Sequence, residues 1–241
     1  LREELGLSRG GHPVFEGQHS PRMVLALFSR VLADPQPDWP PNVRITGAIP
    51  YNGAEPPPRL SDELEAFLSA GPPPVVFTLG SSAVSVAGDF YTESLKAVEA
   101  IGVRAVLLIG SRPENRPGGA LPPGVRLEEF APHASLFPRA SLIVHQGGMG
   151  TLQQALRSGR PTLMVPFAHD QPDNAHRVRA LGVSRTLRPG RYRAGRVADE
   201  LRTLLEEPSY RERAETIGER VRAEDGVKNA CDAIEEVLAS A

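Results

Sequence analysis

The sequence predicts an α/β fold in which helices cover both faces of a parallel β-sheet. From about residue 60 to residue 182, short apolar runs alternate at short intervals with segments of helical period. The runs are continuous rather than alternating, which is typical of strands buried on both faces. Several of them also end in glycine, serine or histidine immediately before a helix begins, as parallel strands often do.

The composition is that of an ordinary globular protein. The 241 residues are 40% hydrophobic and 23% charged, enough for one core or for one core and an appendage. A net charge of −2 argues against a general nucleic-acid surface, and the single cysteine excludes an intrachain disulfide or a multi-cysteine zinc site. No run is long enough for a membrane-spanning helix, and none reads as a signal peptide, so we expect a cytoplasmic protein.

The first 60 residues are expected to form a helix, a strand and two proline-rich connections. Apolar side chains at helical spacing predict a helix that starts near Ser20 and ends before Pro35; they are Val24, Leu27, Phe28, Val31 and Leu32. A short strand is expected at 43–49. The proline-rich segment 51–59 suits a hinge, and we place the main domain boundary there.

The next segment begins the alternation of helices and strands. We expect the Ser61 hydroxyl to cap a helix that closes at Gly71. Strands are expected at 74–79, 103–109, 125–127, 142–144 and 162–165, and helical segments at 87–101, 135–137, 151–156 and 175–181. Beyond Val183 the chain is expected to be mostly helical, with amphipathic faces at 197–205 and 227–238. Cys231 lies on the second of these faces and is expected in the core.

The most informative stretch is 141–156, Ser-Leu-Ile-Val-His-Gln-Gly-Gly-Met-Gly-Thr-Leu-Gln-Gln-Ala-Leu. It predicts a strand, a tight loop and a helix N-terminus. Gly147, Gly148 and Gly150 would let the backbone approach a ligand, and the free N–H groups of a first helical turn favour a phosphate. Thr151 adds a hydroxyl, and His145 would stand at the strand end. Neither common phosphate-binding glycine fingerprint fits, and an ordinary tight turn is the alternative.

Two further strands deliver polar residues to the same predicted sheet edge. The strand at 162–165 leads to Asp170 and Gln171, just before another helix. The strand at 74–79 ends in Gly80, Ser81 and Ser82. Since the carboxyl ends of parallel strands form the ligand crevice of open α/β sheets, these loops are expected to converge.

Residues 128–178, including Glu-Glu-Phe-Ala-Pro-His, His-Gln-Gly-Gly and Asp-Gln, resemble the donor-binding signature of the UDP-glycosyltransferase family. These are inverting transferases of the GT-B fold, and the bacterial members that act on natural products and lipids look most similar. Segments 74–82 and 37–47 resemble the first strand of the same C-terminal domain and the approach to it. The resemblance implies a Rossmann-like C-terminal half of a GT-B fold, with an acceptor-domain remnant and linker at 1–55, the nucleotide-sugar domain at 56–225 and a C-terminal helix at 226–241.

The resemblance also implies a role for individual residues. Donor diphosphate contacts would be His145, Gly147, Gly148, Gly150, Thr151, Ser81 and Ser82; nucleobase and ribose contacts Phe130, Ala131, His133 and Gln153; and sugar contacts Asp170 and Gln171. Asp170 also reads as a helix N-cap. Phe130 and His133 stand where plant members have Trp and Gln, and Gln153 where many members have Glu, which leaves uridine or thymidine open. No Asp-x-Asp occurs, so neither a metal nor a cofactor is expected.

The expected function is the donor-binding part of an inverting glycosyltransferase that moves a hexose from a UDP- or dTDP-sugar to a small-molecule or lipid hydroxyl. The alternatives are a non-catalytic nucleotide-sugar binding subunit that needs a separate acceptor-binding chain, and a sugar-nucleotide epimerase. In the family the catalytic base lies in the preceding domain, so no base is assigned. The chain alone is therefore expected to be incomplete, with an acceptor-domain partner or a second copy as partner. Acceptor and donor sugar stay open.

Overall fold

The computed structural model describes residues 2–8, 11–12, 17–51 and 59–240. The chain divides into two compact units. One comprises residues 1–48 and 225–241, and the other residues 49–224. Within the described part of the chain, no helix is long and apolar enough to cross a membrane.

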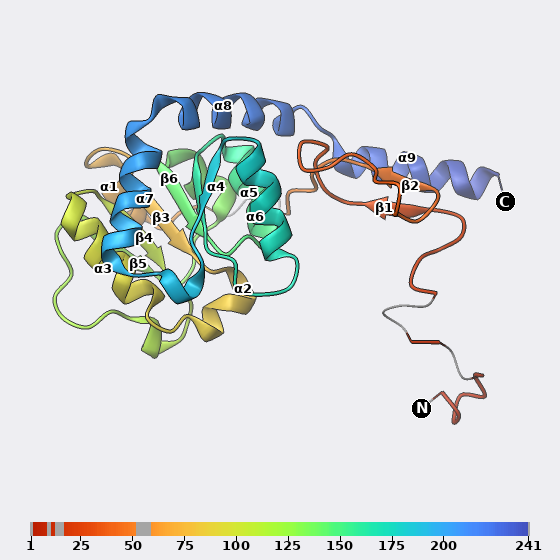
Figure 1. The fold of residues 1–241 in the computed structure, drawn as a ribbon, viewed down its shortest axis with the longest axis horizontal. Coiled ribbons are helices and arrows are strands. Elements are labelled where there is room, and N and C mark those ends of the chain that lie inside the picture. The colour runs from red at the N-terminus through yellow and green to blue at the C-terminus, as the bar shows by residue number, and fades with distance from the viewer. Residues whose placement is uncertain (1, 9–10, 13–16, 52–58, 241) are drawn as a thin grey trace. The chain divides into compact units, whose positions relative to one another are not determined.

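The larger unit is built on a six-stranded parallel sheet (Figure 1). Its strands are β3 (Val75–Thr78), β4 (Ala105–Leu108), β5 (Val125–Glu128), β6 (Leu142–His145), β7 (Thr162–Met164) and β8 (Ser184–Thr186). Their order across the sheet is β5-β4-β3-β6-β7-β8, and every neighbouring pair is parallel. The predicted α/β fold is confirmed.

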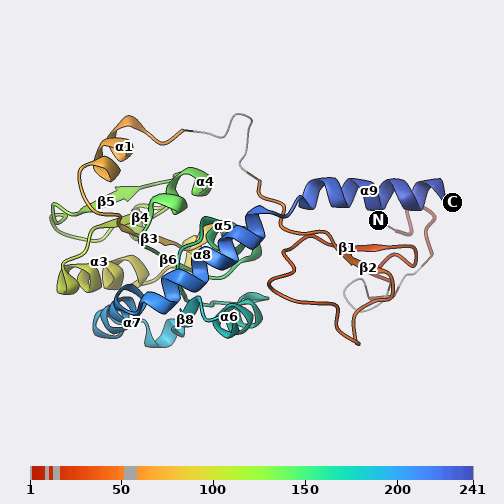
Figure 2. The same cartoon turned by 90° about the horizontal axis from the view of Figure 1, so that it is seen from above.

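Helices cover both faces of this sheet (Figure 2). On one face, α3 (Phe90–Ile101) and α7 (Ala194–Glu206) pack against the side chains of Val75 and Phe77. On the other, α1 (Asp62–Ser69), α4 (His133–Leu136) and α5 (Met149–Ser158) share a core with Val76. Because successive side chains of a strand point to opposite faces, continuous apolar runs are what this two-sided burial requires.

Further helices and turns complete the unit. The other helices are α2 (Gly80–Ala83), α6 (Gln171–Ala180) and α8 (Pro208–Arg222), and four 3-10 turns are η1 (Val84–Val86), η2 (Pro113–Asn115), η3 (Phe137–Arg139) and η4 (Pro189–Arg191). The Ser61 hydroxyl accepts the Leu64 N–H at 3.2 Å, which confirms the predicted cap of α1. The serine loop expected after β3 is instead the helical turn α2.

The strand order reverses next to β3. The chain runs outward from β3 to β4 and β5, then returns to the other side of β3 and runs outward again through β6, β7 and β8. Connections from β3 and β6 therefore leave the sheet in opposite directions and open a crevice at the carboxyl ends of these two strands.

The smaller unit contains a two-stranded parallel sheet and helix α9 (Gly226–Ala239). Its strands are β1 (Val24–Ala26) and β2 (Val43–Ile45), in the register Val24 to Val43. The helix predicted from Ser20 is therefore wrong. The apolar spacing fitted a helix, but hydrogen bonding to a partner strand far along the chain decides the backbone conformation. Only the later part of the predicted face, Val31 and Leu32, is buried.

Helix α9 packs through small side chains. Ala230 and Ala233 are buried, and Asn229 donates its amide to the Thr46 carbonyl oxygen at 2.8 Å. The larger apolar residues Val227, Ile234 and Leu238 are exposed, and so is Cys231. The expectation that Cys231 lies in the core is wrong, because close packing of the helix uses the alanine side.

Helix α8 approaches α5 so closely that one contact has no room for a side chain. A Cβ added at Gly218 would lie 2.7 Å from the Cα of Gly159. Backbone cannot yield as a flexible side chain does, so we expect Gly218→Ala to lower the free energy of unfolding by about 1–3 kcal/mol. Urea unfolding of Gly195→Ala is the control, because a Cβ at Gly195 meets nothing within 4 Å. Equal stability of the two variants would contradict the close contact.

Candidate functional site

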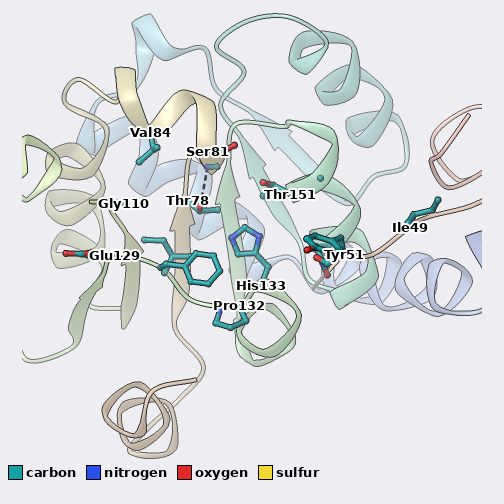
Figure 3. Close-up of a pocket in the computed structure, with 15 residues that line it drawn as sticks. Ile49, Tyr51, Thr78, Ser81, Val84, Gly110, Glu129, Pro132, His133 and Thr151 are labelled. Carbon is teal, nitrogen blue, oxygen red and sulfur yellow. Dashed lines mark hydrogen bonds between the residues drawn. The ribbon is translucent and has the colours of Figure 1, made fainter. Parts of the chain in front are cut away.

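A cavity of about 560 Å³ opens at the carboxyl ends of β3, β4, β5 and β6, where the strand order reverses. Its volume is typical of a small-molecule site. The lining residues that the structure describes are Ile49, Tyr51, Thr78, Gly80, Ser81, Val84, Leu108, Gly110, Glu129, Phe130, Pro132, His133, Gly150, Thr151 and Gln154. Figure 3 draws these lining residues as sticks, and His133 lies near the middle of the view. None of these residues is Lys or Arg.

One end of the cavity is formed by the first turn of α5. Gly148 is the N-cap residue, and the first intrahelical bond runs from the Leu152 N–H to the Gly148 carbonyl oxygen at 2.9 Å. The N–H groups of Met149, Gly150 and Thr151 precede that bond and have no acceptor within the helix. Gly150 and Thr151 line the cavity. This end can therefore hold an anion through backbone donors, a hydroxyl and the helix dipole.

The loops after β3 and β6 meet at Gly80. Its φ is +62°, and an added Cβ would collide with Gln146 Nε2 and lie 3.2 Å from Thr151 Oγ1. A Cβ at Gly148 would lie 2.9 Å from the same Gln146 atom. The Gln146 amide thus occupies a notch between two glycines, and this notch brings Ser81 and Thr151 to the same cavity.

His145 ends β6, directly before Gln146, and is fully buried. Its Nδ1 accepts the Gly147 N–H at 3.1 Å, and its Nε2 has no hydrogen-bond partner. Burial, together with nearby His133, lowers the pKa of His145 to about 3. The ring is therefore neutral at pH 7. Since Nδ1 is an acceptor, the proton is on Nε2, and His145 carries one unused donor.

Asp170 and Gln171 do not line the cavity. They stand at the start of α6, which is linked to Gly147 of the glycine loop, residues 147–150. Gln171 Oε1 accepts the N–H groups of Phe167 at 2.7 Å and Ala168 at 3.2 Å. Asp170 is the N-cap residue of α6, but its side chain makes no capping bond and accepts from Asn174 Nδ2 at 2.9 Å. The same Asn174 nitrogen donates to the Gly147 carbonyl oxygen at 2.9 Å.

The opposite end of the cavity is apolar and aromatic. Phe130 is 71% exposed and lines it, whereas Ala131 is buried in the core behind it. His133 stacks on Phe137 with a ring separation of 4.3 Å, and burial lowers its pKa to about 4. A flat ring of a ligand can therefore pack on Phe130 and on the uncharged His133 ring, although the acidic Glu129 also lines the cavity.

The predicted site residues do not all reach the cavity. Gly150, Thr151, Ser81, Phe130 and His133 line it. His145, Gly147, Gly148, Ala131, Gln153, Asp170, Gln171 and the exposed Ser82 do not. Gln154, the residue after Gln153, does line the cavity, and its Nε2 donates to the Tyr51 carbonyl oxygen at 3.3 Å.

Sequence analysis also missed residues whose role depends on tertiary contacts. Gln146 and Asn174 lie inside the stretches that the motif covers, but nothing in their spacing shows that one fills a glycine notch and the other bridges two loops. Thr78 is at the end of a predicted strand, and its hydroxyl accepts the Gly80 N–H at 3.3 Å. A polar residue that ends a buried strand is the one signal that could have found it.

Burial of neutral His145 predicts a loss of stability in mild acid. The unfolded chain takes up the proton near the ordinary pKa of 6.5, whereas the folded chain resists it down to about 3. Stability is therefore full above pH 6.5 and declines as the pH falls towards 3, by about 2 kcal/mol for this group at pH 5. His145→Asn keeps an acceptor for the Gly147 N–H but cannot titrate, so we expect it to lose about 2 kcal/mol less than wild type between pH 7 and pH 5.

Urea unfolding at the two pH values measures this difference. His176→Asn, at an exposed histidine of α6, is the matched control and should follow the wild type. An equal loss in wild type and His145→Asn would show that His145 is not held neutral by the fold.

Known proteins resemble this chain in sequence and in fold. Residues 93–236 match the family described as the erythromycin biosynthesis protein CIII-like, C-terminal domain. O-mycaminosyltylonolide 6-deoxyallosyltransferase of Streptomyces fradiae is 37% identical over 231 residues, which cover 95% of this chain and 51% of the relative. A sterol 3-beta-glucosyltransferase of Saccharomyces cerevisiae is 30% identical over 241 residues, 96% of this chain and 20% of that protein. The chain thus spans about half, or less, of these relatives.

Solved structures show the same fold. The glycotransferase of kitacinnamycin superposes with a TM-score of 0.75 at 28% identity, over 90% of this chain and 55% of that one. The glycosyltransferase VinC, in complex with dTDP, gives a TM-score of 0.71 at 26% identity, over 90% and 52%. Because the family match covers more than half of the residues, the chain belongs to the erythromycin biosynthesis protein CIII-like C-terminal domain family of GT-B glycosyltransferases.

Proposed function

We propose that this chain is the donor-binding part of an inverting glycosyltransferase, and that it holds a UDP- or dTDP-hexose for transfer to a hydroxyl of a small molecule or lipid. One observation carries the proposal. A single cavity has free backbone donors of a helix N-terminus at one end and an apolar, aromatic surface at the other. A nucleoside diphosphate needs both, in that order along its length.

The donor is proposed to lie along the cavity with its diphosphate at the first turn of α5. Gly150, Thr151 and Ser81 would contact the phosphates, with His145 Nε2 as a further donor once the loop adjusts to the ligand. The base would lie against Val84, Gly110 and Phe130. These assignments are supported by the lining residues and by the unused donor on His145.

Ribose is proposed to contact Gln154 rather than Gln153, because Gln154 is the amide that lines the cavity. Asp170 and Gln171 would bind the sugar hydroxyls, since a carboxylate and an amide together supply acceptors and donors. Their hydrogen bonds to Asn174, Phe167 and Ala168 would fix the direction in which the free atoms point.

The chemistry asked of this chain is to stabilise the leaving group. When an acceptor oxygen forms its bond to the anomeric carbon, the bond to the diphosphate breaks and the diphosphate keeps the electron pair. Positioned neutral donors stabilise that charge because they need not reorganise as it develops. The acceptor proton needs a base, and no residue of this chain is assigned to it.

Either pyrimidine fits the proposal. VinC was solved with dTDP, and its likeness to this chain supports thymidine. Sterol 3-beta-glucosyltransferases are relatives as well, and their names indicate a sugar but no base, so uridine stays open. A binding subunit that acts with a separate acceptor-binding chain is the second candidate, since the same cavity would serve it. Both candidates require nucleotide binding. Sugar transfer by this chain alone to a panel of phenols, sterols and macrolides would exclude the second.

A charge at Gly150 tests the phosphate end. A Cβ at Gly150 meets nothing within 4 Å, so the position accepts a side chain without a clash. We expect Gly150→Asp to weaken binding of UDP and dTDP at least tenfold, about 1.4 kcal/mol, relative to Gly150→Asn. The two side chains have the same shape, so the difference isolates the charge. Calorimetry would measure it, and equal affinities would sink the assignment.

Binding is also predicted to need no divalent metal. Among the described residues, no three His, Cys, Asp or Glu side chains are grouped so that they could hold a metal ion, and the donors at α5 already favour an anion. The affinity for dTDP measured with a chelator should therefore stay within about twofold of that with Mg²⁺. A tenfold loss on chelation would contradict this prediction.

A further inference from the structure

Asn115 is a buried polar side chain that the proposed contacts do not use. It ends η2 and is 5% exposed. Both hydrogens of its side-chain amide are donated to backbone: Nδ2 lies 2.9 Å from the Val84 carbonyl oxygen and 2.8 Å from the Ile109 carbonyl oxygen. One amide thus joins the segment that follows β3 to the end of β4.

The two joined segments form one wall of the cavity. Val84 begins η1 and lines the cavity, and so does Gly110, which directly follows Ile109. Gly110 has a φ of +68°, and a Cβ added there would lie 2.9 Å from Val84 Cγ2. The Val84 side chain therefore rests directly on the Gly110 backbone, with the Asn115 amide tying the two segments together beside them.

We infer that Asn115 is a positioning residue for the nucleobase, which it serves by fixing Val84 against Gly110. This inference rests on the proposed function. A flat pyrimidine gains its contact energy from a wall of fixed position, because dispersion falls steeply with a small gap. Without the Asn115 donors, two carbonyl groups each lose one hydrogen bond, and the link that holds η1 against the end of β4 is gone.

The test compares Asn115→Ala with wild type by calorimetric titration of dTDP and UDP. We expect the dissociation constant of both nucleotides to rise at least tenfold. The dissociation constant of inorganic pyrophosphate, which has no base, is obtained by competition and should change less than twofold. Asn229→Ala is the matched control, since it removes a hydrogen bond from a side-chain amide to a backbone carbonyl in the other unit. This variant should bind both nucleotides as wild type does.

A double-mutant cycle with Val84→Ala separates positioning from general stability. If Asn115 acts through Val84, then Asn115→Ala should add less than a twofold effect in the Val84→Ala background. Should Asn115→Ala fail to fold, Gly110→Ala displaces Val84 from the other side and should raise the same nucleotide dissociation constants without changing pyrophosphate competition.

Three results would overturn the inference: wild-type affinity in Asn115→Ala, an equal loss for pyrophosphate and nucleotides, or full additivity with Val84→Ala. A wild-type chain that binds neither dTDP nor UDP would instead refute the proposed function, and the inference with it. The wild-type titration alone distinguishes these two failures.

Discussion

The site depends on a close approach of two loops in which a Cβ at Gly80 or Gly148 would collide with the Gln146 amide. The Gln146 amide fills the space between these glycines and brings the turn after β3 against the first turn of α5. Sheet order makes the approach available, because β3 and β6 are neighbours whose chains leave in opposite directions. The hydroxyls of Ser81 and Thr151 reach one cavity only because that notch is closed.

The anion binding that we propose would not rely on a cationic side chain. His133 and His145 are both held neutral by burial, and none of the described lining residues is Lys or Arg. The lining then offers the helix N-terminus and hydroxyls as donors, beside one acidic residue, Glu129, while the unused N–H of His145 lies outside the lining. Such donors are weaker than a guanidinium in water. In a partly dry crevice they gain strength and are already oriented, which is the property a departing diphosphate needs.

Local sequence signals sufficed for five of the six strands of the larger sheet but not for contacts between distant segments. Those five strands were predictable because burial on both faces imposes continuous apolar runs, whereas β8, Ser-Arg-Thr, carries no apolar run and was not expected. The segment at Val24 was mistaken for a helix, since only its pairing with Val43 makes it a strand. In the site, glycines and strand-end polar residues marked the loops. Asn115, Asn174 and the choice of Gln154 over Gln153 depend on tertiary geometry, which spacing along the chain does not encode.

Asn174 links the loop proposed to hold the phosphates to the residues proposed to hold the sugar. Its amide bridges the Asp170 carboxylate and the Gly147 carbonyl oxygen, so the end of the β7 loop is attached to the glycine loop by a single side chain. A Cβ added at Gly147 would lie 3.5 Å from the Gln171 carbonyl oxygen and would displace the end of the Met164 side chain. If Asp170 and Gln171 hold the sugar, as we propose, a shift of the phosphate loop must shift them too. The anomeric carbon and its leaving group would then keep their relative position however the crevice opens, and this alignment is the part of an in-line displacement that a donor domain can supply.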